Sequence, residues 1–327
     1  MKKVLITGAT GFIGSNLAAK LVEQKTGVRC LVRNSSSLQR IEGLPVDLVY
    51  GDLGVSDSLE PAVQGVDAVI HLAGKTKARS DEEFYTVNSA GTLNLLKAVA
   101  RCNPSIKQFI YMSSIAAAGP GIDRKPVTAS DLSVPISSYG ASKLAGEEAV
   151  QAFVPQIPVT ILRPGIVFGP GDADGLSLFK IIAAGIRPSL GFGNRYYSFI
   201  YVDDLVQAVI NALGNTKAVD KTIFLASYPE VSWNEFMSRA AGSLGKRTIP
   251  VFIPVAAAYA IAVASELLSN IRGSHTIVNR QKVVEMKQRY WVCDTADQEK
   301  ILGVNASVPL EQAVDSTVSW YRSQGWL

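Results

Sequence analysis

The segment T-G-A-T-G-F-I-G near the N-terminus constrains the fold of this chain more than any other part of it. Its glycines follow an apolar run typical of a strand, Val4–Thr7, and they open an amphipathic run typical of a helix, Ile13–Glu23. In that context Gly8 and Gly11 let the backbone turn tightly and approach a pyrophosphate, while Gly14 lets helix and strand pack closely. The first N–H groups of the helix would then face the anion. The alternative is a glycine turn that only reverses the chain.

Short apolar runs alternate with amphipathic runs through the first half of the chain, which predicts parallel strands joined by right-handed helical crossovers. We therefore expect an α/β fold, a doubly wound parallel (Rossmann) sheet with helices on both faces. The expected strands are Val4–Thr7, Val28–Val32, Asp47–Tyr50, Ala68–Leu72, Gln108–Met112 and Val159–Leu162. The expected helices are Ile13–Glu23, Ser58–Val63, Glu82–Ala100 and Tyr139–Phe153.

The alternation of strands and helices breaks after Arg163, where P-G-I-V-F-G-P-G-D indicates a loop. A later strand, Thr222–Leu225, is expected to return to the main sheet. Later helices are expected at Gly175–Ala184, Val202–Leu213, Trp233–Leu244 and Leu310–Tyr321. The predicted domains are a dinucleotide-binding domain of residues 1–163 plus about 198–226, and a smaller, discontinuous substrate domain of residues 164–197 plus 227–327.

Composition argues against several classes of function. A net charge of +4 over 327 residues, with no Lys/Arg stripe interleaved with aromatics, predicts no nucleic-acid surface. The three scattered cysteines and the two histidines show no ligand spacing, so free thiols and no metal site are expected. The N-terminus enters the glycine turn without a secretory signal pattern, so a cytoplasmic location is expected.

Residues Thr248–Ser265 carry no charge, and their length approaches that of a membrane span. However, Pro250 and Pro254 interrupt the first half of the segment, and its many alanines make it only weakly lipophilic. We therefore favour a buried or substrate-lining helix that starts after Pro254 over a transmembrane helix. A helix lying on the bilayer surface is a third interpretation.

Residues at the ends of the predicted strands bear on the choice of dinucleotide. Arg33 follows the second strand, where an NAD-selective protein often has an acidic residue, and an arginine there can receive the 2′-phosphate of NADP. NADP is therefore favoured over NAD. Asp52, after the third strand, could accept from the adenine amino group or cap the helix that follows. In H-L-A-G, Ala73 and Gly74 leave room for the cofactor, whereas His71 is expected to be a packed structural residue.

Tyr139 and Lys143 stand four residues apart in Y-G-A-S-K, on one face of a predicted helix. A free phenol has a pKa near 10, too high for a base at neutral pH. An ammonium about 4 Å away contributes roughly 4 kcal/mol at an effective dielectric constant near 20. This could lower the pKa of the phenol by up to about 3 units, toward the range of general acid–base catalysis. The lysine could also hold the nicotinamide ribose. The alternative is an ordinary half-buried tyrosine.

The motifs together resemble those of the extended short-chain dehydrogenase/reductase superfamily, in the family's order: T-G-A-T-G-F-I-G, H-L-A-G, T-V-N-S-A-G-T, M-S-S-I-A, Y-G-A-S-K and R-P-G-I-V-F-G-P-G. The resemblance implies a tyrosine acid/base, its lysine partner, a serine that binds the reacting oxygen and an asparagine in a proton relay. By motif these are Tyr139, Lys143, Ser114 (with Ser113 as a substitute) and Asn88. It also implies a homodimer packed through Glu82–Ala100 and Tyr139–Phe153. The residues expected to contact the dinucleotide are Gly8, Thr10, Gly11, Phe12, Ile13, Gly14, Arg33, Asp52, Leu53, Leu72, Ala73, Gly74, Tyr139, Lys143 and Pro164.

Members of this superfamily divide mainly between sugar-nucleotide epimerases or dehydratases and reductases of less polar alcohols and ketones. The former often carry arginine and then aspartate where this chain has Tyr197 and Ser198. Arg187, Arg195 and Arg289 could still clamp a diphosphate, but each is expected to be a surface charge. The uncharged segment and the later R-Y-W-V-C-D resemble the hydroxysteroid dehydrogenase and dihydroflavonol reductase branch.

We therefore expect an enzyme that transfers hydride between NADP or NAD and a hydroxyl or ketone of a small, largely apolar substrate. A nucleotide-sugar epimerase or dehydratase is the alternative. A non-catalytic NADP-binding sensor or scaffold is a second alternative, although such proteins commonly lose the tyrosine or the lysine that this chain keeps.

Overall fold

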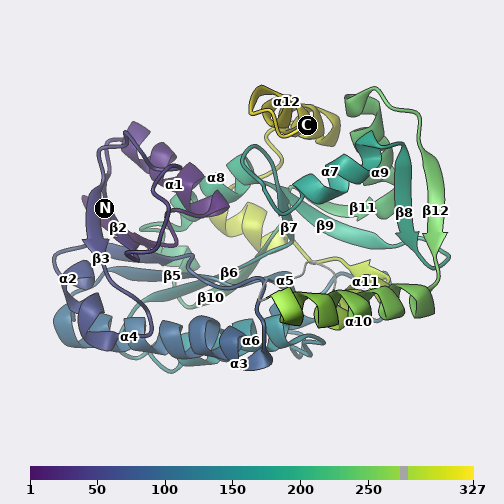
Figure 1. The fold of residues 1–327 in the computed structure, drawn as a ribbon. Helices are drawn as coiled ribbons and strands as arrows, with labels where there is room; N and C mark the ends of the chain where they lie inside the picture. Colours follow the sequence, from purple (N-terminus) through teal and green to yellow (C-terminus); the bar gives the residue numbers. More distant parts are fainter. Residues whose placement is uncertain (273–278) are drawn as a thin grey trace.

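A computed structural model describes the backbone of residues 1–272 and 279–327, with side chains for residues 1–266 and 279–327. Its largest sheet has seven strands, all parallel, which confirms the expected doubly wound fold (Figure 1). The late strand does return to this sheet, at its edge. In spatial order the strands are β10 (Lys221–Leu225), β6 (Val159–Pro164), β5 (Gln108–Met112), β4 (Ala68–His71), β1 (Lys3–Thr7), β2 (Gly27–Val32) and β3 (Asp47–Tyr50).

Helices cover both faces of this sheet and form a separate core on each (Figure 1). Successive residues of β1 point in opposite directions, so that Val4 and Ile6 pack in one core and Leu5 in the other. The helices on the first face are α1 (Phe12–Glu23) and α8 (Val202–Ala212). Those on the second face are α2 (Glu60–Val63), α4 (Gly91–Cys102) and α6 (Ser138–Gln151).

The expected helix Glu82–Ala100 is a composite. It consists of α3 (Asp81–Tyr85), a turn of π-helix (Thr86–Ala90) and α4. The Ser80 hydroxyl caps it by accepting from the Glu83 N–H. A π-turn inside a helix often marks a functional position, and here it contains Asn88.

The second part of the chain surrounds a four-stranded sheet rich in aromatic residues. Its strands are β7 (Ile166–Phe168), β9 (Tyr196–Tyr201), β11 (Tyr228–Ser232) and β13 (Tyr290–Trp291). The helices that pack on it, α7 (Leu176–Ala183), α9 (Trp233–Leu244) and α12 (Leu310–Ser323), lie where the sequence predicts helices. The remaining elements are η1 (Ser56–Leu59), α5 (Ile115–Ala118), β8 (Ile186–Leu190), η3 (Thr216–Ala218), β12 (Ile249–Ile253), α10 (Val255–Arg272), α11 (Arg280–Lys287) and η4 (Gln298–Leu302).

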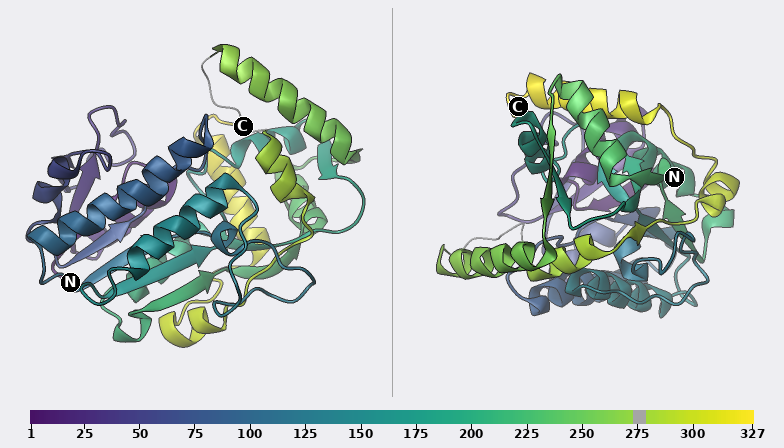
Figure 2. Two further views of the ribbon diagram at one scale, coloured as in Figure 1. Left: turned by 90° about the horizontal axis from the view of Figure 1, so that it is seen from below. Right: turned by 90° about the vertical axis from the view of Figure 1, so that its right-hand side faces the viewer.

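The uncharged segment forms β12 and then α10, so the helix does begin directly after Pro254. The prediction that this helix is buried or lines the substrate cavity is wrong. Most of residues 255–266 are exposed or half-exposed, Ala262 alone among them is fully buried, and none of them lines the cavity described below. The reason is that α10 rests on few neighbours and projects from the body of the molecule (Figure 2). Within the described residues no helix is both long and apolar enough to cross a membrane.

The division into two domains at the predicted boundaries stays a prediction. One segment assigned to the second predicted domain packs against the first. Leu302 and Val304 lie in the core beneath the large sheet, beside α8. The Asn211 amide on α8 donates to the Leu302 carbonyl at 2.8 Å. Residues 298–304 therefore attach the last part of the chain to the layer of helices beside the large sheet.

Candidate active site

The glycine turn between β1 and α1 is built for close backbone approach. Gly8 has a positive φ of 75°, and a Cβ there would lie 2.7 Å from the Ala73 nitrogen. A Cβ at Gly14 would lie 2.2 Å from the Gly8 carbonyl oxygen. Gly11 is the N-cap of α1, and no side chain caps the helix there. The first N–H groups of a twelve-residue helix are thus left for an anion. Together these features fit a dinucleotide pyrophosphate.

The other residues expected around the dinucleotide lie at the carboxyl ends of neighbouring strands. Arg33 is exposed directly after β2 and forms no ion pair with any described residue. Asp52 does not cap the following helix, because its Oδ1 accepts from the Gly54 N–H at 2.8 Å and closes a local turn. Leu53 is buried against Gly91 at the start of α4. Pro164 ends β6 and is buried.

Tyr139 and Ser114 both line one cavity, where α6 and the end of β5 meet. The Ser137 hydroxyl caps α6 by accepting from the Gly140 N–H, which places Tyr139 in the first turn. Ser114 caps α5, accepting from the Ala116 N–H at 3.1 Å. Burial raises the pKa of Tyr139 to about 12, and a hydrogen bond with Ser114 offsets part of that rise.

Lys143 is buried on α6, one turn after Tyr139. Its Nζ donates to the Met112 carbonyl at 2.5 Å and lies 4.5 Å from the centre of the Tyr111 ring. Burial lowers the pKa of Lys143 to about 8. The expectation that Lys143 lowers the pKa of Tyr139 is wrong, since that pKa is raised. Burial is the largest cause of the raised pKa of Tyr139, and the charge of Glu285 adds to it.

Asn88 is fully buried in the π-turn, and its carboxamide is saturated. Its Oδ1 accepts from the Lys75 N–H at 2.8 Å, and its Nδ2 donates to the Lys75 carbonyl at 3.0 Å and to the Ser142 hydroxyl at 2.9 Å. A Cβ at Gly74 would lie 2.9 Å from Asn88 Oδ1 and 3.7 Å from Lys143 Nζ. Asn88 thus fixes the loop after β4 beside the lysine, and the proton-relay role stays a prediction.

Ser113, the possible substitute for Ser114, is hydrogen-bonded to another side chain. Ser113 is buried and donates to Glu147, which in turn forms a bidentate ion pair with Arg163 at 2.6 and 2.8 Å. Both ionic side chains are 6% exposed. The sequence analysis did not include Glu147, although it follows Lys143 by one helical turn and Arg163 opens R-P-G-I-V-F-G-P-G. The pair ties α6 to β6.

His71 is a structural residue, as expected. It is fully buried, with its Nδ1 2.6 Å from the Thr7 hydroxyl and its Nε2 3.0 Å from the Thr92 hydroxyl. Burial lowers the pKa of His71 to about 3, so the imidazole is neutral at physiological pH. No group of histidine, cysteine and acidic side chains within the described residues could hold a metal ion.

The cavity at Tyr139 has a volume of about 440 Å³ and largely aromatic walls. Its aromatic lining comes chiefly from the four-stranded sheet and the helices on it: Phe168, Phe179, Tyr197, Phe199, Trp233 and Phe236. Tyr197 is thus a wall residue. Ser198 also borders the cavity, with its hydroxyl donating to the Pro229 carbonyl at 2.5 Å.

Five charged side chains line this cavity in the described part of the chain, and four of them form two ion pairs. The fifth, Asp172, accepts from the N–H groups of Asp174 and Gly175 at 2.9 and 3.1 Å. Lys77 pairs with Asp174 at 2.5 Å and Lys282 with Glu285 at 3.0 Å, and no other cation lines the cavity in the described part of the chain. The three candidate arginines, Arg187, Arg195 and Arg289, are absent from the lining. Arg289 is exposed, whereas Arg195 is buried and donates to the Met286 carbonyl at 2.9 Å. The expectation that Arg195 is a surface charge is wrong, because it holds the end of α11.

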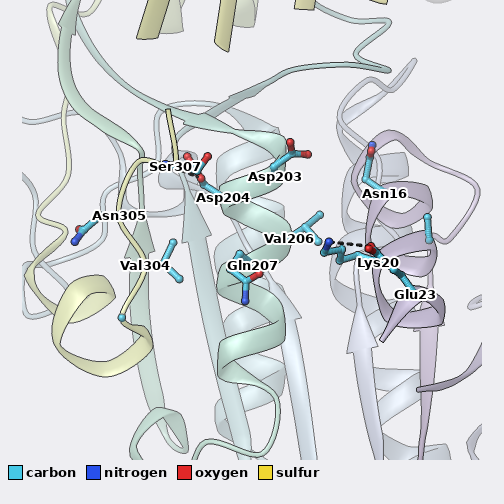
Figure 3. A pocket seen from close by; sticks show the side chains of 12 residues that line it. Asn16, Lys20, Glu23, Asp203, Asp204, Val206, Gln207, Val304, Asn305 and Ser307 are labelled. Atoms are coloured by element: carbon cyan, nitrogen blue, oxygen red, sulfur yellow. Dashed lines mark hydrogen bonds and ion pairs between the residues drawn. The ribbon is translucent and has the colours of Figure 1, made fainter. Parts of the chain in front are cut away.

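A second cavity of about 570 Å³ lies between α1, α8 and residues 303–307 (Figure 3). Its lining is a mixture of polar and apolar residues, with Lys20 paired to Glu23 at 2.8 Å and Asp203 nearby. None of the predicted catalytic residues lines it. The cavity at Tyr139 is therefore the candidate active site.

A family model described as the NAD dependent epimerase/dehydratase family matches residues 4–226. The matched residues include the glycine turn, Ser114, Tyr139 and Lys143. The chain belongs to this family. The match confirms the resemblance to the extended short-chain dehydrogenase/reductases, and the protein is an NAD(P)-dependent enzyme of that type.

Relatives in the family include both reductases and epimerases. The chain is 30% identical to the ceramide reductase of Caulobacter vibrioides, over 99% of this chain and 96% of that protein. It is 30% identical to the UDP-glucose 4-epimerase of Vibrio cholerae, over 78% of this chain and 79% of that protein. It is 28% identical to a putative dihydroflavonol 4-reductase of Synechocystis, over 98% of this chain and 95% of that protein.

Solved structures agree on the fold. The UDP-glucose 4-epimerase of Thermotoga maritima aligns over 98% of this chain and 99% of its own, with a TM-score of 0.79 and 21% identity. The UDP-glucuronic acid 4-epimerase of Bacillus cereus aligns equally well, at 22% identity. At these identities the likeness extends to the fold alone.

Proposed function

We propose that the protein transfers hydride between a nicotinamide cofactor and a hydroxyl or ketone of a largely apolar substrate. The observation that carries this proposal is the aromatic cavity onto which Ser114 and Tyr139 face together. An aromatic wall of this kind suits an apolar body, and the two hydroxyls give it a polar end. The glycine turn that could hold the dinucleotide lies at the same edge of the large sheet.

In this proposal the nicotinamide supplies or accepts the hydride when bound. The Ser114 hydroxyl donates to the substrate oxygen and orients it. Because the pKa of Tyr139 lies far above neutrality, its phenol is protonated at pH 7 and can donate a proton to that oxygen. Lys143, with a pKa of about 8, is mostly charged at that pH and stabilises the phenolate that remains. The starting protonation state thus favours reduction of a ketone.

The charges of the cavity support an apolar substrate over a sugar nucleotide. A diphosphate needs cationic partners, preferably arginine, and both lysines in the described lining already pair with carboxylates. The similarity to a ceramide reductase over nearly the whole chain points to a lipid-like ketone or alcohol. Long-chain lipids of the ceramide type are therefore our first candidates.

The test is turnover with NADPH and NADH against ceramide-type ketolipids, ketosteroids, dihydroflavonols and UDP-sugars. We expect nicotinamide oxidation with at least one apolar ketone, and no turnover of UDP-sugars. Turnover of a UDP-sugar without net nicotinamide consumption would replace the proposal with the epimerase alternative.

That alternative has one specific observation behind it. Lys77 and Lys282 both line the cavity, and loss of their pairing with carboxylates would create a cationic site. The relative from Vibrio cholerae is a UDP-glucose 4-epimerase. Isothermal titration of UDP-glucose into the NAD-loaded protein tests this possibility directly.

We also propose NADP as the preferred dinucleotide, because Arg33 is exposed and forms no ion pair with the residues that the structure describes. A homodimer packed through Glu82–Ala100 and Tyr139–Phe153 remains our proposal for the assembly, and sedimentation of the purified protein would test it.

A further inference from the structure

Large apolar side chains are exposed along β8, β12, the loop after β8 and α10. In order of position they are Ile186 (40% exposed), Phe192 (81%), Ile249 (71%), Val251 (40%), Phe252 (47%), Tyr259 (45%) and Ile261 (56%). We call them together the β12–α10 surface. Phe192 and Phe252 stack on each other in solvent, with ring centres 5.3 Å apart. Contiguous exposed apolar groups of this size usually mark an interaction site.

The elements that carry these residues are neighbours in the structure. β12 pairs with β8 in parallel along its whole length, from Ile249 opposite Ile186 to Ile253 opposite Leu190. α10 follows β12 directly, and its Ala262 packs near Leu190. In Figures 1 and 2 these elements lie at the end of the molecule opposite β3, and α10 projects outward.

The charge around this surface has one sign. Neither residues 175–202 nor residues 236–265 contain an aspartate or glutamate, and they carry six basic residues between them. Of these, Arg195 is buried and Arg239 pairs with Glu311 at 2.7 Å. Lys246 and Arg247 are exposed immediately before β12 and form no ion pair with any described residue. Glu266, the first acidic residue after this stretch, is paired with Arg280 at 2.7 Å. An apolar face bordered by unopposed bases is complementary to an anionic lipid surface.

We propose that the β12–α10 surface docks the protein on an anionic phospholipid bilayer, with α10 lying along the interface and Phe192 and Phe252 inserted among the acyl chains. A second copy of the chain fits this surface poorly. A two-fold contact would bring the basic groups of one copy against those of the other. A bilayer of anionic lipid supplies the opposite charge and an apolar interior together.

Docking would bring the active-site cavity close to the bilayer. Val283 of α11 packs in the small core beneath α10, and Met286 of the same helix lines the cavity and is 39% exposed. One helix thus separates the lipid-facing surface from the site of reaction. The proposal rests on the surface and is independent of the reaction assigned to Tyr139.

The test is co-sedimentation of the full-length, cofactor-loaded protein with vesicles of phosphatidylglycerol and phosphatidylcholine, compared with vesicles of phosphatidylcholine alone. We expect binding to the mixed vesicles that weakens with added salt. Phe192→Ser combined with Phe252→Ser should weaken binding about tenfold or more, because two large apolar groups are lost. Lys246→Glu combined with Arg247→Glu should weaken it about tenfold through charge reversal.

The matched control is Leu48→Ser on β3, an exposed apolar residue (38%) at the opposite end of the molecule, which should bind as the unchanged protein does. All the substituted positions are exposed, and an unchanged thermal unfolding midpoint confirms that each variant is folded. The proposal is overturned if the unchanged protein does not bind the mixed vesicles, or if the phenylalanine pair and Leu48→Ser behave alike. It is equally overturned if the phenylalanine pair converts a lipid-free dimer to a monomer, since the surface would then be a subunit interface.

Discussion

The Nζ of Lys143 lies 2.5 Å from the carbonyl oxygen of Met112, the last residue of β5. An ammonium held by a strand carbonyl has part of its charge satisfied inside the protein before any ligand binds. The same contact places the charge beside Gly74, where the loop after β4 passes. The lysine is therefore positioned by the sheet as well as by its own helix.

Replacing Lys143 should abolish catalysis and, at neutral pH, increase the stability of the fold. Its pKa falls from 10.5 to about 8 on folding, so the charged lysine disfavours the folded state fully below pH 8, and the cost vanishes above pH 10.5. Lys143→Met should thus abolish turnover and raise the free energy of unfolding at pH 7 by up to about 3 kcal/mol. The gain should shrink at pH 10. Urea unfolding at both pH values measures it, and destabilisation at pH 7 would show that the bond to Met112 outweighs the burial cost.

Tyr139→Phe should abolish turnover while leaving the dinucleotide affinity within a few-fold of its original value. The ring remains to pack near Phe84, at 6.0 Å between centres, and only the hydroxyl that moves the proton is lost. Single-turnover kinetics together with fluorescence titration of NADPH provide both readouts. If the variant also lost its affinity for NADPH, the tyrosine would be a structural residue and the acid/base role would be withdrawn.

Local patterns predicted most of the fold because the relevant contacts are local or repeat along the sheet. The glycine turn, the alternation of strands and helices, and the position of Tyr139 one turn before Lys143 on one helix all follow from spacing within short stretches of sequence. The burial of Arg195 could not be predicted in this way, because its partner is the carbonyl of Met286, far along the chain. The exposure of α10 depends likewise on which distant elements fail to cover it. The pKa of Tyr139 depends on burial, which spacing does not encode.

Arg33→Asp should shift the preference of the enzyme toward NAD. An aspartate at the end of β2 can accept from the ribose hydroxyls, and it would repel the 2′-phosphate of NADP. We expect the ratio of NADP to NAD affinity to fall by about two orders of magnitude. The 2′-phosphate of NADP loses its attraction to Arg33 and is repelled by the new carboxylate, and the two effects together are worth about 3 kcal/mol. Arg239→Asp on α9, outside both cavities, is the control. An unchanged ratio would remove Arg33 from the cofactor site.

Gly14→Ala should damage both folding and cofactor binding. The new Cβ would lie 2.2 Å from the Gly8 carbonyl oxygen, and neither backbone segment can move without opening the turn. We expect a loss of about 2 kcal/mol or more in the free energy of unfolding, and much weaker NADPH binding. Gly242→Ala within α9 is the matched control, because a Cβ there meets nothing within 4 Å. It should leave stability unchanged or increase it by up to about 1 kcal/mol.

Removing one member of the buried ion pair between Glu147 and Arg163 should destabilise the protein far more than replacing both members. Glu147→Gln leaves the guanidinium of Arg163 uncompensated at 6% exposure, and we expect a loss of about 3–5 kcal/mol in the free energy of unfolding. Glu147→Leu combined with Arg163→Met removes both charges and should lie much closer to the original stability. Because the carboxylate of Glu147 raises the pKa of Lys143 one turn away, each of these variants should also lower that pKa and move the alkaline limit of the pH–rate profile downward. Equal destabilisation by the single and the double change would mean that the ion pair itself, and not the unpaired charge, carries the stability.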